Sequence, residues 1–198
     1  MEVSRFKSRQ IDDDTFNDPA FWKFGTYEME SQYYPLIGEL VSVFNSLEDT
    51  LSEELVEYIE NEIMPNAAYL IVSGLSFSSK WKLWTEMLLN FLSEDLGELS
   101  LKEKQELKAY KTEITKMGKA FERFGKIRND LIHGTWGYMN EQGLIKTKTK
   151  TNSKKQLVHE HIEIKRKDFK ELISEIEKFD ISFLAFSSEF RKNEVLPE

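Results

Sequence analysis

The longest stretch of uninterrupted helical pattern in the chain runs from Leu101 to His133. It contains no proline, and its apolar side chains recur at spacings of three and four residues, the pattern of one buried helix face. Those side chains are Leu107, Tyr110, Ile114, Met117, Phe121 and Phe124. Gly134 comes next and predicts a left-handed helix stop. We therefore expect one long helix with His133 in its last turn, its apolar face covered by other helices.

Further helical patterns lie on both sides of this run. They extend from Pro35 to about Ile63, from Ala67 to Leu75, from Trp81 to Leu96, and from near Asp168 to Phe190. The acidic residues of the first run, among them Glu48 and Glu54, are expected on its exposed side. A break is expected from Ser76 to Ser79, and Trp84 belongs to the stripe of the third run that we predict to be core. Asp168 and Glu171 have the spacing of a capping box. Together these patterns predict an all-α fold, an up-and-down helical bundle of four to five helices.

The segment between about residues 136 and 164 has a different period. Polar and apolar residues alternate from Leu144 to Lys150 and from Gln156 to Ile164. Gly137 and turn-forming residues at 140–143 and 151–154 bound these two stretches. Alternation of this kind is typical of β-strands that bury one face. We therefore expect a β-hairpin inserted before the last helix.

Residues 1–34 are predicted to form an aromatic-rich N-terminal arm, and residues 35–198 a single helical domain. The arm holds Phe16, Phe21, Trp22, Phe24, Tyr27, Tyr33 and Tyr34. Because so many aromatic side chains rarely remain in water, we expect the arm to cover the bundle or a partner subunit. A base-stacking platform is the alternative, although only Lys23 lies among these aromatics.

The composition excludes several kinds of chemistry. The chain has no cysteine, so it can form no disulfide, thiol nucleophile or zinc knuckle. There is no signal-peptide pattern and no apolar stretch long enough for a membrane span, which predicts a cytoplasmic protein without a membrane partner.

The net charge of −8 conceals a division along the chain. Residues 1–100 carry 6 Lys and Arg against 19 Asp and Glu, and residues 101–198 carry 21 against 16. A basic half of this kind would admit a polyanion locally, but the same division arises when the acidic half is simply the solvated half.

Three polar side chains stand near the end of the longest helical run: Arg128, Asn129 and His133. Asn129 and His133 are four residues apart and share a helix face, whereas Arg128 and His133 are about 140° apart around the axis. A single helix therefore does not direct all three at one point. Convergence requires fraying near Gly134, or a second copy of the helix across a twofold axis, which predicts a homodimer.

The segment Arg128-Asn129-x-x-x-His133 resembles the R-x4-6-H motif of the HEPN superfamily, and Gly134 and Trp136 are similar to the residues that often follow that motif. The resemblance in helix order covers most of the chain beyond the arm. It implies a small helical bundle, commonly dimeric. For many members it also implies a metal-independent endoribonuclease of a toxin, antiphage or RNA-processing system.

The chain departs from one subgroup of this superfamily. Members controlled by a partner nucleotidyltransferase have a tyrosine two residues after the histidine, where this chain has Thr135. Tyr138 is nearby but does not fit that pattern. The resemblance leaves open a cognate antitoxin or another regulatory protein as a partner.

Cleavage of RNA without a metal needs a base for the ribose 2′-hydroxyl, an acid for the departing 5′-oxygen, and positive charge near the phosphate. His133 can act as acid or base, Arg128 offers a planar fork of donors, and Asn129 could orient the imidazole or bind the ribose. One histidine cannot easily be both acid and base in one step, which again favours a composite site in a dimer. No cofactor and no metal are expected for this reaction.

Basic residues on either side of the motif predict a path for RNA. They are Lys119, Arg123 and Lys126 on the long helix, and Lys146, Lys148 and Lys150 on the hairpin. Residues 144–170 hold 9 Lys and Arg against 3 Asp and Glu, so RNA affinity should fall as salt rises. Lysines that protect a strand edge from aggregation are an equal alternative.

Two other functions stay open. A noncatalytic module of the same fold would bind nucleotide, RNA or a protein partner, with Arg128 and Asn129 in an interface hydrogen-bond cluster. A metal-dependent hydrolase would use His159 and His161 on one strand face, but this pair lacks a third ligand at a diagnostic spacing.

Overall fold

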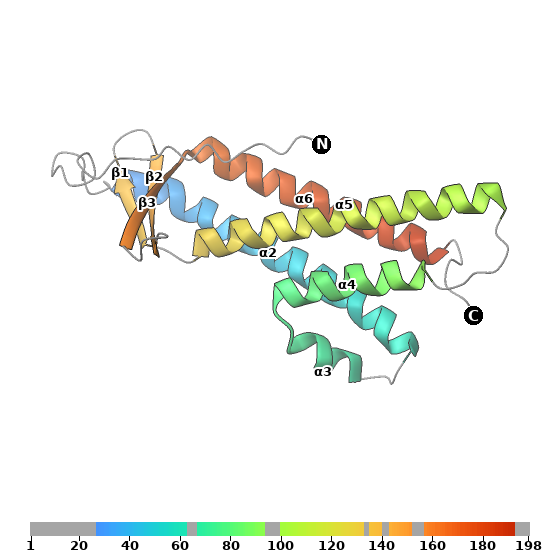
Figure 1. The fold of residues 1–198 in the computed structure, drawn as a ribbon. Helices are drawn as coiled ribbons and strands as arrows, with labels where there is room; N and C mark the ends of the chain where they lie inside the picture. The colour runs from blue at the N-terminus through green and yellow to red at the C-terminus, as the bar shows by residue number, and fades with distance from the viewer. Residues whose placement is uncertain are drawn as a thin grey trace. The chain divides into compact units, whose positions relative to one another are not determined.

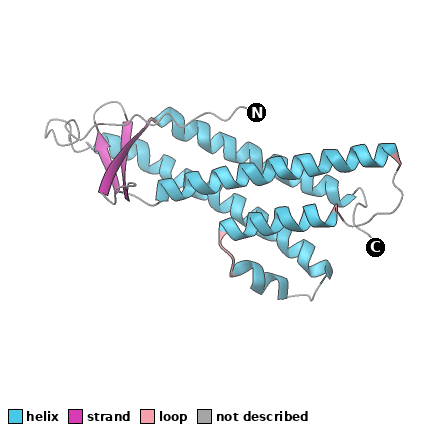
Figure 2. Cartoon of the chain, viewed as in Figure 1, coloured by secondary structure: helices cyan, strands magenta, loops and turns pink. Residues whose placement is uncertain are grey.

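The computed structural model describes residues 27–62, 67–93, 100–132, 135–139, 143–151 and 157–192, and most of these residues are helical (Figures 1 and 2). The helices are α2 (Tyr27–Glu62), α3 (Ala67–Ser73), α4 (Phe77–Phe91), α5 (Leu101–Ile132) and α6 (Arg166–Lys192). The strands are β1 (Thr135–Met139), β2 (Gly143–Thr151) and β3 (Leu157–Ile164). The prediction of a mainly helical chain is confirmed. No helix within the described ranges is both long enough and apolar enough to cross a membrane.

The first helix starts earlier than predicted. α2 begins at Tyr27 and contains Pro35 in its interior, so the last part of the predicted arm is helical. Proline within a helix typically costs about 3 kcal/mol, because it removes a hydrogen bond and its ring meets the preceding turn. Packing offsets this cost: Tyr33 is buried, and its ring lies edge-on to Phe169 with 6.1 Å between centroids. The aromatic residues before Tyr27 lie outside the described residues.

The strands form one antiparallel sheet in the order β1-β2-β3. The predicted strands from Leu144 to Lys150 and from Gln156 to Ile164 correspond to β2 and β3, which pair antiparallel, and β1 is a third strand that was not predicted. Gly137, which we interpreted as a strand boundary, pairs with Ile145, between the pairs Trp136–Lys146 and Tyr138–Leu144. A glycine weakens a strand interior but does not end it when the neighbouring strand supplies hydrogen-bonding partners.

The chain divides into two compact units. Unit 1 consists of residues 1–44 and 128–175, and unit 2 of residues 45–127 and 176–198. The buried apolar residues of unit 1 come from the start of α2, the end of α5, β3 and the start of α6. They are Tyr33, Leu36, Leu40, Phe44, Leu131, Ile164, Phe169, Leu172 and Ile173.

The core of unit 2 is built largely from aromatic rings. Trp84, Phe121 and Phe183 are fully buried, and their centroids are 5.0 to 6.1 Å apart in edge-on pairs. Phe179 adds another edge-on contact to Phe121, at 4.9 Å. Trp84 was predicted as a core residue, and this prediction is confirmed. Edge-on contacts of this kind add to the free energy gained from burying the rings.

Serine caps fix the starts of two helices in unit 2. The Ser76 side chain accepts a hydrogen bond from the Ser79 backbone N–H, so α4 begins at Phe77 where we had predicted a break. At α5, the Ser100 hydroxyl accepts from the Glu103 N–H, and the Glu103 carboxylate accepts from the Ser100 N–H at 2.7 Å. This reciprocal pair is a capping box. These hydrogen bonds lower the pKa of Glu103.

The start of α6 differs from its prediction. The Asp168 carboxylate accepts a hydrogen bond from the Lys165 N–H at 3.0 Å, so Asp168 lies inside the first turn rather than at the cap. Glu171, the predicted capping-box partner, instead forms an ion pair with Lys167. The predicted capping box is therefore wrong, because the chain enters the helix directly from β3 at Lys165.

Candidate nucleic-acid site

The predicted catalytic residues follow the end of α5. The helix ends at Ile132 and β1 begins at Thr135, so Arg128 and Asn129 lie in the last turns of α5. His133 and Gly134, between helix and strand, lie outside the described residues. The predicted position of His133 in the last turn of the helix is therefore not tested.

Arg128 and Asn129 occupy different sides of α5. Arg128 is half-buried and lies about 60° around the axis from Leu131, which is buried in unit 1. Asn129 is exposed and lies about 160° from Leu131. The two side chains therefore differ both in direction around the axis and in exposure.

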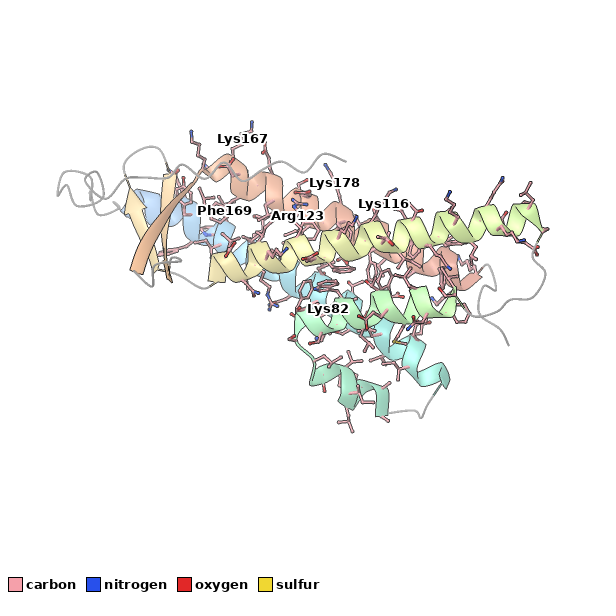
Figure 3. All side chains as sticks on the ribbon, viewed as in Figure 1. Lys82, Lys116, Arg123, Lys167, Phe169 and Lys178 are labelled. Atoms are coloured by element: carbon pink, nitrogen blue, oxygen red, sulfur yellow. The ribbon has the colours of Figure 1, made fainter. Side chains whose placement is uncertain are left out.

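The three predicted contact residues on α5 share one side of the helix within unit 2. Lys119 and Lys126 are exposed and Arg123 is half-buried, on the side opposite the buried Phe121. Arg123 is labelled on α5 in Figure 3. The predicted grouping of these residues is therefore seen in the helix geometry. It lies on the solvent side of α5, whereas Arg128 is on the side of α5 that carries Leu131.

Two of these cations already have partners in the chain. The Lys126 ammonium donates a hydrogen bond to the Glu122 carboxylate at 2.7 Å, and this bond lowers the pKa of Glu122. The Arg123 guanidinium lies 4.9 Å from the centroid of the Phe124 ring. A phosphate would therefore compete with Glu122 for Lys126, so this side of α5 presents less net positive charge than the lysine spacing suggests.

The hairpin lysines lie at alternate positions of one continuous strand. β2 extends from Gly143 to Thr151, so the positions of Lys146, Lys148 and Lys150 belong to one face of the sheet. Lys146 pairs with Trp136 on β1 and with Ile162 on β3. The side chains of all three lysines lie outside the described residues, and so do those of His159 and His161.

Sequence reasoning missed a buried ion pair in unit 2. Glu48 was predicted on the exposed acidic side of α2, but its carboxylate accepts a hydrogen bond from the Lys80 ammonium at 2.9 Å. The Lys80 side chain is 9% exposed and that of Glu48 is 19% exposed. The clue was available, because Lys80 follows Phe77 by three residues and precedes Trp84 by four, so helical spacing places it on the buried side of α4.

A second buried polar group, Glu54, was also predicted to be exposed and is 4% exposed. Arg191 on α6 donates to Glu54 and to Glu57, which ties the end of α6 to α2 inside unit 2. Burial raises the pKa of Glu54, and the opposing effect of Arg191 is smaller. Glu54 follows Leu47 by seven residues and precedes Tyr58 by four, so its spacing places it in the buried stripe of α2.

The surroundings of Glu54 explain why its charge is disfavoured. Its Oε2 atom, the Tyr58 hydroxyl and the Ser187 hydroxyl are buried and have no hydrogen-bonding partner among the described residues. Ser187 nevertheless lowers the pKa of Glu54, against the larger effect of burial. Burial and the neighbouring Glu54 raise the pKa of Tyr58 far above its ordinary value. The cluster has the character of a packed structural junction between two helices.

Comparison of the chain with protein-family models, curated proteins and solved structures finds no match.

Proposed function

We propose that the chain is a HEPN-like, metal-independent endoribonuclease that uses Arg128, Asn129 and His133. The observation that carries the proposal is the position of the motif: α5 ends at Ile132, which leaves Arg128 and Asn129 in its last turns and His133 directly after it. Residues at the end of a rigid element are positioned more accurately than residues on long loops.

The charge distribution around this segment supports the proposal. Residues 128–175, the second segment of unit 1, hold 10 Lys and Arg against 7 Asp and Glu, although the chain as a whole has a net charge of −8. Six of these cations lie on β2 or at the start of α6: Lys146, Lys148, Lys150, Arg166, Lys167 and Lys170. The hairpin of β2 and β3 would form one wall of an RNA path, with contacts to phosphates that weaken as salt rises.

Each motif residue has a role in this mechanism. His133 takes the proton of the ribose 2′-hydroxyl, or donates one to the departing 5′-oxygen, because imidazole exchanges protons near neutral pH. Arg128 donates two hydrogen bonds to the nonbridging oxygens and stays charged throughout. Asn129 orients the ribose or the imidazole. Attack of the 2′-oxygen on phosphorus breaks the bond to the 5′-oxygen and leaves a 2′,3′-cyclic phosphate.

A site with one histidine per chain calls for a second copy of the motif. Two chains related by a twofold axis would supply one imidazole as base and the other as acid. The resemblance to the HEPN superfamily suggests a toxin or antiphage role with a cognate antitoxin or other regulatory partner.

The test is cleavage of a 5′-labelled RNA in the presence of EDTA. We expect the wild-type protein to cleave, and Arg128→Ala and His133→Ala each to lose about 100-fold or more in rate. Gln105→Ala, an exposed change on the same helix, is the matched control and should cleave like wild type. Equal cleavage by all four proteins would contradict the proposal. So would the absence of cleavage by wild type on a set of structured and single-stranded RNAs.

A noncatalytic HEPN-like module that binds nucleotide, RNA or a protein partner is the second candidate. The observation that favours it is the internal pairing of basic residues on α5, seen in the Lys126–Glu122 hydrogen bond. Under this alternative, His133→Ala would change binding or stability and no RNA would be cleaved. A salt titration of RNA binding by the uncleaving protein would then measure how many phosphates it contacts.

A further inference from the structure

The outer side of α6 in unit 2 exposes apolar residues in the middle of a well-packed helix. Ile181 is 69% exposed and Leu184 is 45% exposed, and Ala185 beside them is also exposed. Phe183 and Phe190 on the opposite side of the same helix are fully buried. The exposure is therefore not a consequence of a frayed end. A helix of a monomer would place polar residues on this side.

Lys178, Ile181, Ala185 and Ser188, which we call the outer stripe of α6, follow one another at intervals of three, four and three residues. These intervals are those of a helix seam that packs against another helix. The side chain of Ile181 is large, and those of Ala185 and Ser188, which follow it in the stripe, are small. Leu184 borders the stripe on one side, and Glu189 follows its last residue.

We propose that the outer stripe of α6 pairs antiparallel with the outer stripe of a second copy of this chain. In that arrangement Ile181 of each copy lies opposite Ala185 of the other, so a large side chain meets a small one at both central positions. Lys178 of each copy lies opposite Ser188 and beside Glu189 of the other. The twofold axis repeats each contact, which gives two oppositely charged pairs flanking an apolar centre.

The charges of Lys178 and Glu189 favour an antiparallel pair, and they favour a second copy of this chain as the partner. In a parallel pair, Lys178 would face Lys178 and Glu189 would face Glu189, which is repulsive at both ends. The antiparallel pair replaces both repulsions with attractions. The residues that fit opposite the stripe are themselves in the stripe or directly beside it. A second copy of the chain therefore supplies a small residue opposite Ile181 and an acidic residue beside Lys178.

This interface does not depend on the proposed nuclease activity. The outer stripe belongs to unit 2, and Arg128 belongs to unit 1. A protein that pairs through α6 and cleaves nothing would retain this inference and contradict the proposed function. A dimer that cleaves RNA and is indifferent to Ile181→Lys would contradict this inference and retain the proposed function.

The test is sedimentation equilibrium of the full chain over a concentration range that reaches about 100 μM, where even a weak helix pair of this kind should associate. We expect a monomer–dimer equilibrium for wild type. Ile181→Lys should weaken it about 100-fold, because it puts a charge at both central positions. Leu101→Lys, at a single apolar side chain of α5 that is 77% exposed, is the matched control and should leave the equilibrium unchanged.

A charge exchange tests the direction of pairing. Lys178→Glu and Glu189→Lys should each weaken the dimer about tenfold, since each change breaks two surface pairs. The double variant should restore the wild-type constant. Circular dichroism confirms folding of each variant. A monomeric wild type, a dimer indifferent to Ile181→Lys, or a double variant weaker than both single ones would overturn the proposal.

Discussion

The two compact units bury different kinds of residue. Unit 2 buries interlocked aromatic rings, with centroids 4.9 to 6.1 Å apart around Phe121. Its buried charges have partners, as in the pair of Lys80 and Glu48. Unit 1 buries mainly aliphatic residues, with the ring pair of Tyr33 and Phe169 and a small sheet. The contrast suggests that the stability of the chain resides chiefly in unit 2.

The two units also differ in net charge. Unit 2 carries 13 Lys and Arg against 20 Asp and Glu, whereas unit 1 carries 14 against 15, and the basic residues of unit 1 are concentrated in its second segment, with 10 against 7. A unit that is rich in acid repels nucleic acid, whereas a basic segment attracts it. The comparison therefore assigns stability to one unit and the proposed chemistry to the other, and each assignment can be tested separately.

The largest effect is expected at the centre of the aromatic core. Phe121→Ala should lower the free energy of unfolding by about 3 to 5 kcal/mol, because it removes a fully buried ring and leaves a cavity. Leu101→Ala, at the exposed start of the same helix, is the control and should cost less than about 0.5 kcal/mol. Urea unfolding measures both. A loss below about 1 kcal/mol at Phe121 would contradict the assignment of stability to unit 2.

The buried ion pair of unit 2 should give the next largest effect. Lys80→Met removes one partner and leaves the Glu48 carboxylate largely out of solvent without its ammonium, at a cost of about 2 kcal/mol. Lys82→Met, at an exposed lysine of the same helix, should cost almost nothing. Adding Glu48→Gln to Lys80→Met should recover most of the loss. If the double variant is less stable than Lys80→Met alone, the two residues do not act as a pair.

Replacing one glycine in each unit with alanine should change the free energy of unfolding by about 1 kcal/mol, with opposite signs. A Cβ on Gly118 in unit 2 would lie 2.8 Å from the Thr85 hydroxyl oxygen, and this hydroxyl donates to the Trp81 carbonyl. Gly118→Ala should therefore destabilise by about 1 kcal/mol despite the better helix propensity of alanine. Gly38→Ala in unit 1 meets nothing within 4 Å and should stabilise by a similar amount. The same sign for both substitutions would contradict the difference in packing.

The smallest effect is a pH dependence at Glu54. Because the pKa of Glu54 is raised in the folded protein, the folded state binds its proton more tightly than the unfolded state does. This contribution to stability is complete below the ordinary pKa of 4.5 and is lost as pH rises through the raised value. Glu54→Gln removes it. The stability of wild type relative to Glu54→Gln should fall as pH rises from about 4 to 7, as measured by urea unfolding. A relative stability that rises with pH would mean that Arg191 outweighs burial.

Periodicity predicted the helices because their apolar stripes are long. The spacing of Ile114, Phe121 and Phe124 located α5, and these residues are buried. The same method placed Glu48 and Glu54 in solvent, because a carboxylate at a core position looks like any other acidic residue. Only the positions of Lys80 and Arg191 on other helices show that these charges are paired.

The sequence predicted that the helices and strands exist better than it predicted the residues at which they begin and end. Pro35 indicated a first turn, but contact between Tyr33 and Phe169 extends α2 beyond it. Gly137 indicated a strand boundary, but pairing with β2 keeps it inside β1. In both cases a tertiary contact outweighed a local preference that the sequence expresses clearly.

The candidate site was predicted from spacing alone, and this prediction has a physical limit. Spacing identified Arg128 and Asn129 near the end of a helix, and α5 ends there. Spacing alone did not show that Lys126 forms an ion pair with Glu122, because α5 has several lysines and glutamates three or four residues apart and only some of them form pairs. The roles of Arg128, Asn129 and His133 stay a prediction until they are tested.

The most direct test of the division between the units is to measure cleavage and stability on one variant, Arg128→Lys. This change keeps the positive charge and removes the planar fork that binds phosphate oxygens. We predict that its rate of RNA cleavage in EDTA falls about 100-fold, while its free energy of unfolding falls far less than that of Phe121→Ala. An unchanged rate would contradict the account, and so would a loss of stability comparable to that of Phe121→Ala.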